Sequence, residues 1–266
     1  MVGLTAAPGD LSRSPLRRFT PQAAVLLLVA SVAAVVTMGR ARDMGGAQPG
    51  TMGLGLPSFL TMWTPMMAAM MLPTVAPLAA VYARTVRSRR SARLSVFALG
   101  YLTVWAAAGV PAFALARGAG RLAAGNPRAG TVAAVAVYAV CGLYQLTPWK
   151  ERCLSQCRSP VALLLHYGSF RGRWRDYAAG VHHGAYCAGC CWALFVVLLA
   201  AGVMNLFAMG VLVMTVLVEK LWSRGTGFSR VVGVVALALA VAVIWVPALA
   251  PGLHELQVTG PMNMTG

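Results

Sequence analysis

Six cysteines lie within 51 residues of this 266-residue chain, and three of them share a short stretch with two histidines. The stretch reads His182-His183-Gly184-Ala185-Tyr186-Cys187-Ala188-Gly189-Cys190-Cys191. Counted from His183, the cysteines follow at offsets of four, seven and eight, the steps that share one face of an α-helix. Sulfur and imidazole ligands that point the same way suit a soft metal ion. We therefore predict a metal site on a helix that contains His182, His183, Cys187, Cys190 and Cys191.

A second pair of thiols, Cys153 and Cys157, lies in a short basic segment. Their spacing of four places both on one face if the segment is helical. Basic neighbours such as Arg152 favour the thiolate, the form that binds metals. We interpret the pair as a cytosolic metal-docking site, with an inert pair beside the membrane as the alternative. Cys141 is a further candidate ligand, although burial as a small apolar residue explains it better.

Thioethers form a third group of soft ligands. Met66 and Met70 lie four residues apart, and Met67 and Met71 form an adjacent stripe. Methionine is an ordinary core residue, but its neutral sulfur also suits Cu(I). Pro73 and Pro77, which follow the methionines, would kink this helix and free backbone carbonyls. We therefore include all four methionines in the predicted site.

Three polar residues in apolar surroundings are candidates for supporting the site. Gln145 follows Cys141 by one helical turn and is expected to form a hydrogen bond across the bundle. Glu219 either supports the site or reaches the membrane interface together with Lys220. Asn205 lies in an expected turn, where capping the next helix is the alternative.

The composition indicates what positions these residues. Only 11% of the residues are charged, against about 25% in soluble domains, and 59% are hydrophobic. A water-soluble globule could not bury that much apolar surface, so we predict a polytopic membrane protein. The net charge of +16 is no sign of a nucleic-acid partner, because the basic residues lie between apolar runs. The expected partner is the lipid bilayer.

We predict an all-α bundle of about seven transmembrane helices, because a crossing needs about 20 apolar residues and the runs lack the alternation of barrel strands. The spans are expected within 19–39, 59–83, 94–116, 129–149, 177–218 and 231–253, of which 177–218 holds two with a turn near Met204 and Asn205. Six helices is the alternative count. The bundle is expected over 21–250, between a basic cytosolic tail at 1–20 and a short external tail at 251–266.

The distribution of basic residues predicts the orientation. With the N-terminus inside, 17 of the 22 lysines and arginines fall in cytosolic segments, as the positive-inside rule requires. The expected location is the bacterial plasma membrane, with several crossings. Arg17 and Arg18 before an apolar run also resemble a signal peptide. The run continues to Met38, so we expect an uncleaved first helix.

The chain resembles an uncharacterised bacterial family of predicted metal-binding integral membrane proteins, which carry a domain of unknown function. The resemblance covers about residues 57 to 222. It rests on Met66 to Pro73, Tyr144 to Pro148 with Cys153 and Cys157 to Pro160, Cys187 to Trp192, Gly202 to Leu206, and Val218 to Leu221. It implies metal binding by these cysteine-rich and methionine-rich motifs.

Together these observations predict a membrane protein that binds Cu(I), or else Zn(II), for metal transfer, transport or homeostasis. A metal donor or acceptor protein, cytosolic or extracytosolic, is the expected partner. Motifs for nucleotide-driven transport are absent from the sequence, so an enzymatic role is not favoured. One alternative is a thiol–disulfide electron carrier that uses Cys187 and Cys190. Another is a b-type haem held by His182 or His183.

Overall fold

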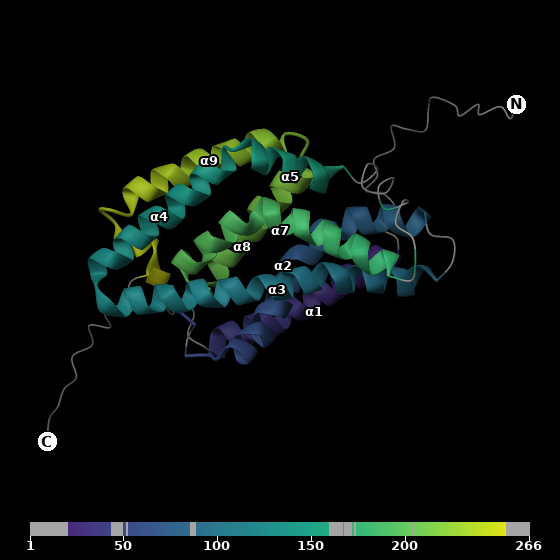
Figure 1. The fold of residues 1–266 in the computed structure, drawn as a ribbon, viewed down its shortest axis with the longest axis horizontal. Helices are drawn as coiled ribbons and strands as arrows, with labels where there is room; N and C mark the ends of the chain where they lie inside the picture. Colours follow the sequence, from purple (N-terminus) through teal and green to yellow (C-terminus); the bar gives the residue numbers. More distant parts are fainter. Residues whose placement is uncertain are drawn as a thin grey trace, which may run out of the picture.

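The structure, a computed structural model, describes residues 21–43, 50–51, 53–85, 89–159, 167, 172, 174–203 and 205–253. Within these ranges every element is a helix, which confirms the all-α prediction (Figure 1). The expected N-terminal tail at 1–20 lies outside the described residues. Of the expected external tail, only Pro251–Leu253 is described, and it packs against three helices of the bundle.

Eight α-helices and two short 3-10 helices are described. They are α1 (Pro21–Asp43), α2 (Leu56–Thr85), α3 (Arg90–Gly125), α4 (Pro127–Gln145), α5 (Pro148–Arg158), α7 (Arg175–Ala201), α8 (Leu206–Leu221), α9 (Gly225–Ala242), η2 (Pro247–Leu249) and η3 (Pro251–Leu253). Each of the seven expected spans overlaps one α-helix, although the span expected at 231–253 is α-helical only as far as Ala242, and α5 is an additional helix. The predicted turn between two spans is present, and Asn205 caps α8, whereas Met204 lies outside the described residues.

In the part of the chain that the structure describes, four helices are long and apolar enough to cross a membrane: α2, α3, α7 and α9. The number rises to five if α4 and α5 form one bent span, so the predicted count of seven is not reached. Two physical reasons account for the difference. Helix α8 has 16 residues and is about 24 Å long, shorter than the roughly 30 Å of hydrocarbon. The apolar part of α1, Ala24–Gly39, is equally short.

The expected span at 129–149 ends early, at Gln145, and the chain bends by 64° into α5. The hydroxyl of Thr147 accepts a hydrogen bond from the backbone N–H of Lys150 at 3.3 Å and so caps the new helix. Pro148 occupies its first turn, where a missing N–H is harmless. A proline also disfavours helical geometry in the residue before it. The bend carries α5 back against α7.

Helix α7 lies at the centre of the bundle (Figure 1). It packs closely on α3 because glycines remove side chains from the contact. A Cβ atom at Gly180 would lie 2.0 Å from the carbonyl oxygen of Phe97, and one at Gly100 would lie 2.3 Å from that of Tyr177. Close helix contacts through small residues are typical of membrane bundles. Helices α4 and α9 pair along one side, and α1 and α2 along the other.

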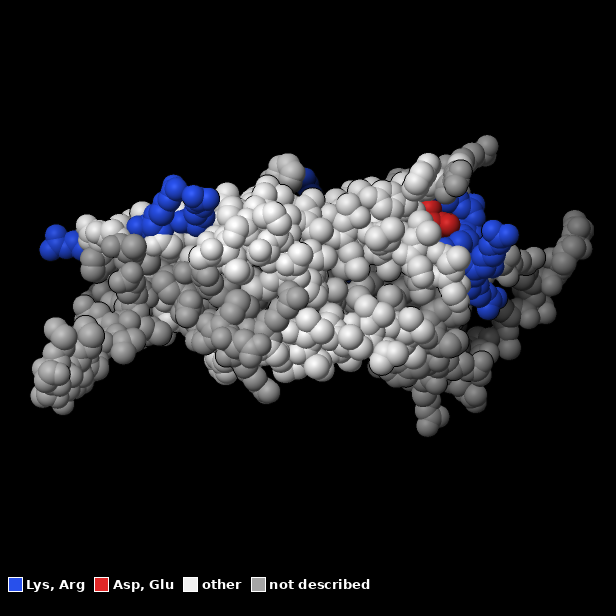
Figure 2. All heavy atoms as spheres, turned by 90° about the horizontal axis from the view of Figure 1, so that it is seen from below, with Lys and Arg blue, Asp and Glu red and all other residues white. Residues whose placement is uncertain are grey.

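The charged residues gather toward the two ends of the elongated molecule, and the broad middle of the face in Figure 2 is mostly free of them. One end carries the exposed residues Arg117, Arg121 and Arg128. Large apolar side chains are exposed between the ends, among them Leu99, Leu143 and Phe207. An apolar belt between charged ends is the surface that a bilayer covers.

Candidate metal centre

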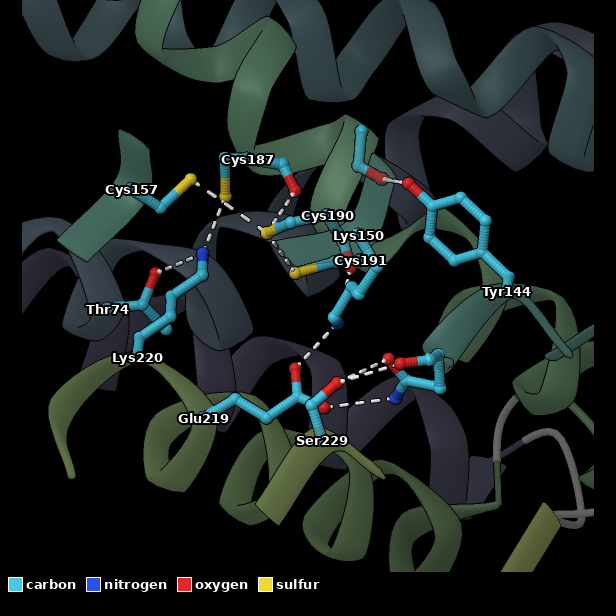
Figure 3. A network of polar contacts seen from close by, with 12 residues as sticks. Thr74, Tyr144, Lys150, Cys157, Cys187, Cys190, Cys191, Glu219, Lys220 and Ser229 are labelled. Atoms are coloured by element: carbon cyan, nitrogen blue, oxygen red, sulfur yellow. Dashed lines mark hydrogen bonds and ion pairs between the residues drawn. The ribbon is translucent and has the colours of Figure 1, made fainter. Parts of the chain in front are cut away.

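Four thiols from two helices face one another in the interior of the bundle (Figure 3). The Sγ of Cys157 on α5 lies 3.8 Å from the Sγ of Cys190 on α7, and the Cys190 Sγ lies 3.2 Å from that of Cys191. Cys187, one turn earlier, presents its carbonyl oxygen to the Cys190 thiol at 3.2 Å. Three of these residues are fully buried, while Cys157 is half-buried. The expected docking pair and the expected helix site therefore meet.

The sulfur of Cys187 has two polar partners. The ammonium group of Lys220 on α8 donates to it at 2.8 Å, and the hydroxyl of Tyr101 on α3 lies 2.9 Å away. Lys220 also donates to the Thr74 hydroxyl on α2 at 3.3 Å. Side chains of α3 and α8 thus contact one thiol of α7, and Thr74 of α2 holds the ammonium group of Lys220.

A second buried lysine supports the backbone beneath the thiols. The ammonium group of Lys150 donates to the Cys190 carbonyl at 2.6 Å and to the Glu219 carboxylate at 2.7 Å. Gln145 donates to the other carboxylate oxygen at 3.0 Å and accepts from the Ser229 hydroxyl at 3.1 Å. The Glu219 carboxylate is thus completely buried and paired within the bundle.

Cys153 lies one turn before Cys157 on α5 and faces Gly189 of α7. A Cβ atom added at Gly189 would lie 3.4 Å from the Cys153 sulfur. The Tyr144 hydroxyl donates to the Gly189 carbonyl and holds α4 against the same stretch. Cys153 and Cys157 thus share one face of α5, as their spacing predicts, and this face packs on α7 at Gly189 and Cys190.

The two histidines stand among aromatic rings. His183 is buried between Tyr101 and Phe97, at ring-centroid distances of 5.8 and 6.2 Å, and its Nδ1 has no hydrogen-bond partner among the described residues. His182 lies edge-on to Tyr186 at 4.9 Å and also contacts Tyr167. Burial raises the pKa of Tyr167, so its hydroxyl stays protonated beside His182.

Helix α2 borders the site. Met66, Met67, Met70 and Met71 are fully buried and belong to the same apolar core as the cysteines of α7. The Tyr101 hydroxyl that contacts Cys187 also donates to the Met71 carbonyl at 3.5 Å. Met71 thus lies beside the Cys187 site through its backbone carbonyl, and the four methionine side chains belong to the same buried core.

The remaining candidates lie further along the helices. Cys141 is buried in the same core and lines an apolar cavity of about 580 Å³ between α4, α7, α8 and α9. Asn205 lies at the start of α8, accepts from the Ala208 N–H at 3.1 Å and donates to the Ala201 carbonyl at 3.1 Å. These contacts fit the capping role that the sequence left open.

The sulfur positions can be compared with the needs of a metal ion. Two thiolates that share one ion at metal–sulfur bonds of about 2.3 Å lie roughly 3.8 Å apart in a tetrahedral site. The Cys157–Cys190 separation of 3.8 Å has this value. The Cys190–Cys191 separation of 3.2 Å is shorter, so these sulfurs would move apart on binding. Within the described ranges, no three His, Cys, Asp or Glu side chains already form a complete metal-holding group.

Sequence reasoning missed the residues that surround the thiols, above all Lys150, Lys220 and Tyr101. Both lysines enter the positive-inside count as interfacial residues, yet Lys150 is completely buried and Lys220 is 8% exposed. The burial of Lys220 could have been predicted. It follows Glu219 at the end of an apolar run, and two adjacent residues of opposite charge can both turn into the bundle. Tyr101 lies within an apolar run and gives no such signal.

A family model described as a copper chaperone, PpoB2, matches residues 60–243. Because the match covers more than half of the chain, the protein belongs to the PpoB2 copper chaperone family. No curated protein and no solved structure matches the chain. The family agrees with the metal-binding resemblance of residues 57 to 222 and indicates copper as the metal. The matched region contains all the thiols, the methionine stripe and both buried lysines.

Proposed function

We propose that the protein is an integral membrane copper chaperone that holds Cu(I) in transit between the thiols of α5 and α7. The observation that carries this proposal is the 3.8 Å separation of the Cys157 and Cys190 sulfurs across two helices. Cysteine and methionine sulfurs are the ligands that suit Cu(I). Copper is the cargo of the protein, and Zn(II) is the competing ion that the same thiols would accept.

The proposed ligands are Cys157, Cys187, Cys190 and Cys191, supplemented by thioethers of the α2 stripe. Burying several thiolates in an apolar interior is costly. Neutral thioethers limit the number of negative sulfurs that the site must accommodate. A site of mixed ligands also releases its ion more easily than one made only of thiolates, as a chaperone requires.

The gradient of burial suggests the route of the ion. Cys153 and Cys157 on α5 are half-buried, whereas Cys187, Cys190 and Cys191 are completely buried. With the N-terminus inside the cell, α5 lies at the cytosolic end of the bundle. A cytosolic donor protein would then deliver Cu(I) to α5, and the ion would pass to the thiols of α7. The bacterial plasma membrane is the proposed location.

Metal analysis of the protein purified in detergent without oxygen tests this function. The parent protein is expected to retain stoichiometric Cu(I), and the triple variant Cys187→Ser, Cys190→Ser and Cys191→Ser is expected to lose it. A parent protein that binds no Cu(I) would contradict the proposal. Thiol labelling in intact cells separates it from the electron-carrier alternative. Protection of Cys187 and Cys190 by copper supports the chaperone, and labelling that follows only the redox state supports the carrier.

A further inference from the structure

The two buried lysines of the site differ in how their charges are compensated. Lys150 forms an ion pair of 2.7 Å with Glu219, and the pair as a whole is neutral. Lys220 forms no ion pair with a carboxylate of the described residues; its partners are the Cys187 sulfur and the Thr74 hydroxyl. The Lys220 ammonium group therefore lies directly beside the thiols, and among the described residues the Cys187 sulfur, as a thiolate, is the partner that can compensate its charge.

We infer that Lys220 is a specificity-determining residue that makes the copper site selective for monovalent ions; this inference rests on the proposed function. Its ammonium nitrogen lies 2.8 Å from the Cys187 sulfur. An ion bound to that sulfur at about 2.3 Å lies at most about 5 Å from the ammonium. Both charges are positive, so they repel each other.

The repulsion depends on the charge of the ion. Coulomb energy is proportional to the product of the two charges, so a divalent ion is repelled twice as strongly as a monovalent one at the same place. At an effective dielectric constant of about 20, the difference at about 5 Å corresponds to roughly 200-fold in relative affinity. Burial keeps Lys220 from turning into water to avoid the ion, because only 8% of the residue is exposed.

The charge count leads to the same result. One Cu(I) with two thiolates and the Lys220 ammonium is neutral overall. With the same two thiolates, a divalent ion leaves one uncompensated positive charge, and neutralising it takes a third buried thiolate; either is costly inside the bundle. Lys220 thus selects among metal ions by their charge, whereas the sulfur ligands select only soft ions over hard ones.

Ag(I) and Cd(II) are suitable probes because both are thiophilic, redox-stable and have the same d10 electron count, while their charges differ. Their dissociation constants would be measured by competition on the full-length protein in detergent, for the parent and for Lys220→Gln. Lys220→Arg is the matched control, because it keeps the positive charge. Lys220→Leu is a second neutral variant, since apolar replacements of buried charges often fold well.

In both neutral variants, the affinity for Cd(II) relative to Ag(I) is expected to rise about 200-fold, and in Lys220→Arg it is expected to stay near the parent value. An unchanged ratio in the neutral variants, with Ag(I) still bound, would overturn the role of Lys220 and leave the copper chaperone proposal intact. A parent protein that does not bind Ag(I) would contradict the proposed function, and this inference with it.

Discussion

Lys150 and Glu219 form an ion pair of 2.7 Å in which the two side chains are 0% and 1% exposed. The pair joins α5 to α8, and the same ammonium group holds the Cys190 carbonyl of α7. It therefore links the helix that carries Cys157 to the helix that carries the other thiols. In the proposed mechanism it is a positioning contact, because it touches no sulfur.

Removing one partner of this ion pair should be strongly destabilising. Lys150→Gln leaves the Glu219 carboxylate buried without its counter-ion, which is expected to reduce the free energy of unfolding by about 3–5 kcal/mol. The melting temperature in detergent is the measurement. The double variant Lys150→Met and Glu219→Leu removes both charges and should recover most of the loss. A double variant as unstable as Lys150→Gln would show that more than charge compensation holds α5 in place.

The two cysteines of α5 should contribute unequally to the retention of Cu(I). Cys157→Ser removes a sulfur next to Cys190 and is expected to weaken Cu(I) retention by more than about tenfold, which corresponds to about 1.4 kcal/mol. Cys153→Ser, one turn away on the same helix, is expected to slow loading from a donor but to leave retention close to that of the parent. Competition with a Cu(I) chelator measures retention. Equal losses in the two variants would argue that both thiols hold the bound ion.

The methionine stripe can be tested without disturbing the packing. Met66→Leu with Met70→Leu conserves volume and apolarity, so folding is expected to survive with a loss below about 1.5 kcal/mol. Copper retention is expected to fall because two thioethers are lost. Met62→Leu, one turn before Met66, is the matched control. If the double variant retains copper as the parent does, the stripe serves packing alone.

Substitutions of glycine test the contact between α3 and α7. Gly180→Ala places a Cβ atom 2.0 Å from the Phe97 carbonyl oxygen, so the two helices must move apart, at a cost of more than about 2 kcal/mol. Gly118→Ala is the control on α3, because no atom lies within 4 Å of the added Cβ, and alanine is the better helix former. Thermal unfolding would compare them. A stable Gly180→Ala variant would contradict the close packing.

Much of the helical framework can be predicted from the sequence, because long apolar stretches without charged residues indicate helices directly. The helical phase of Cys187, Cys190 and Cys191 is equally local and was predictable. The site as a whole is not, because it depends on the bend after Gln145. That bend arises from Thr147 and Pro148, whose capping chemistry an apolarity count ignores. A prediction that lacks this bend places Cys157 in a separate docking segment, away from the thiols of α7.

The buried lysines could not be inferred for a related reason. A positive-inside count treats each lysine as an interfacial residue, because exposure is the usual state of this side chain. Lys150 and Lys220 are buried because partners from other helices compensate them, and those partners are distant in sequence. Such pairing is a property of the packed bundle and leaves no periodic pattern.

X-ray absorption at the copper edge tests the central claim most directly, namely that sulfurs of α5 and α7 hold one Cu(I) together. The full-length protein would be loaded with one equivalent of Cu(I) without oxygen, beside Cys157→Ser. The account predicts a coordination shell made of sulfur alone in the parent, with fewer sulfur neighbours in Cys157→Ser. A shell dominated by nitrogen or oxygen, or a spectrum that Cys157→Ser leaves unchanged, would contradict it.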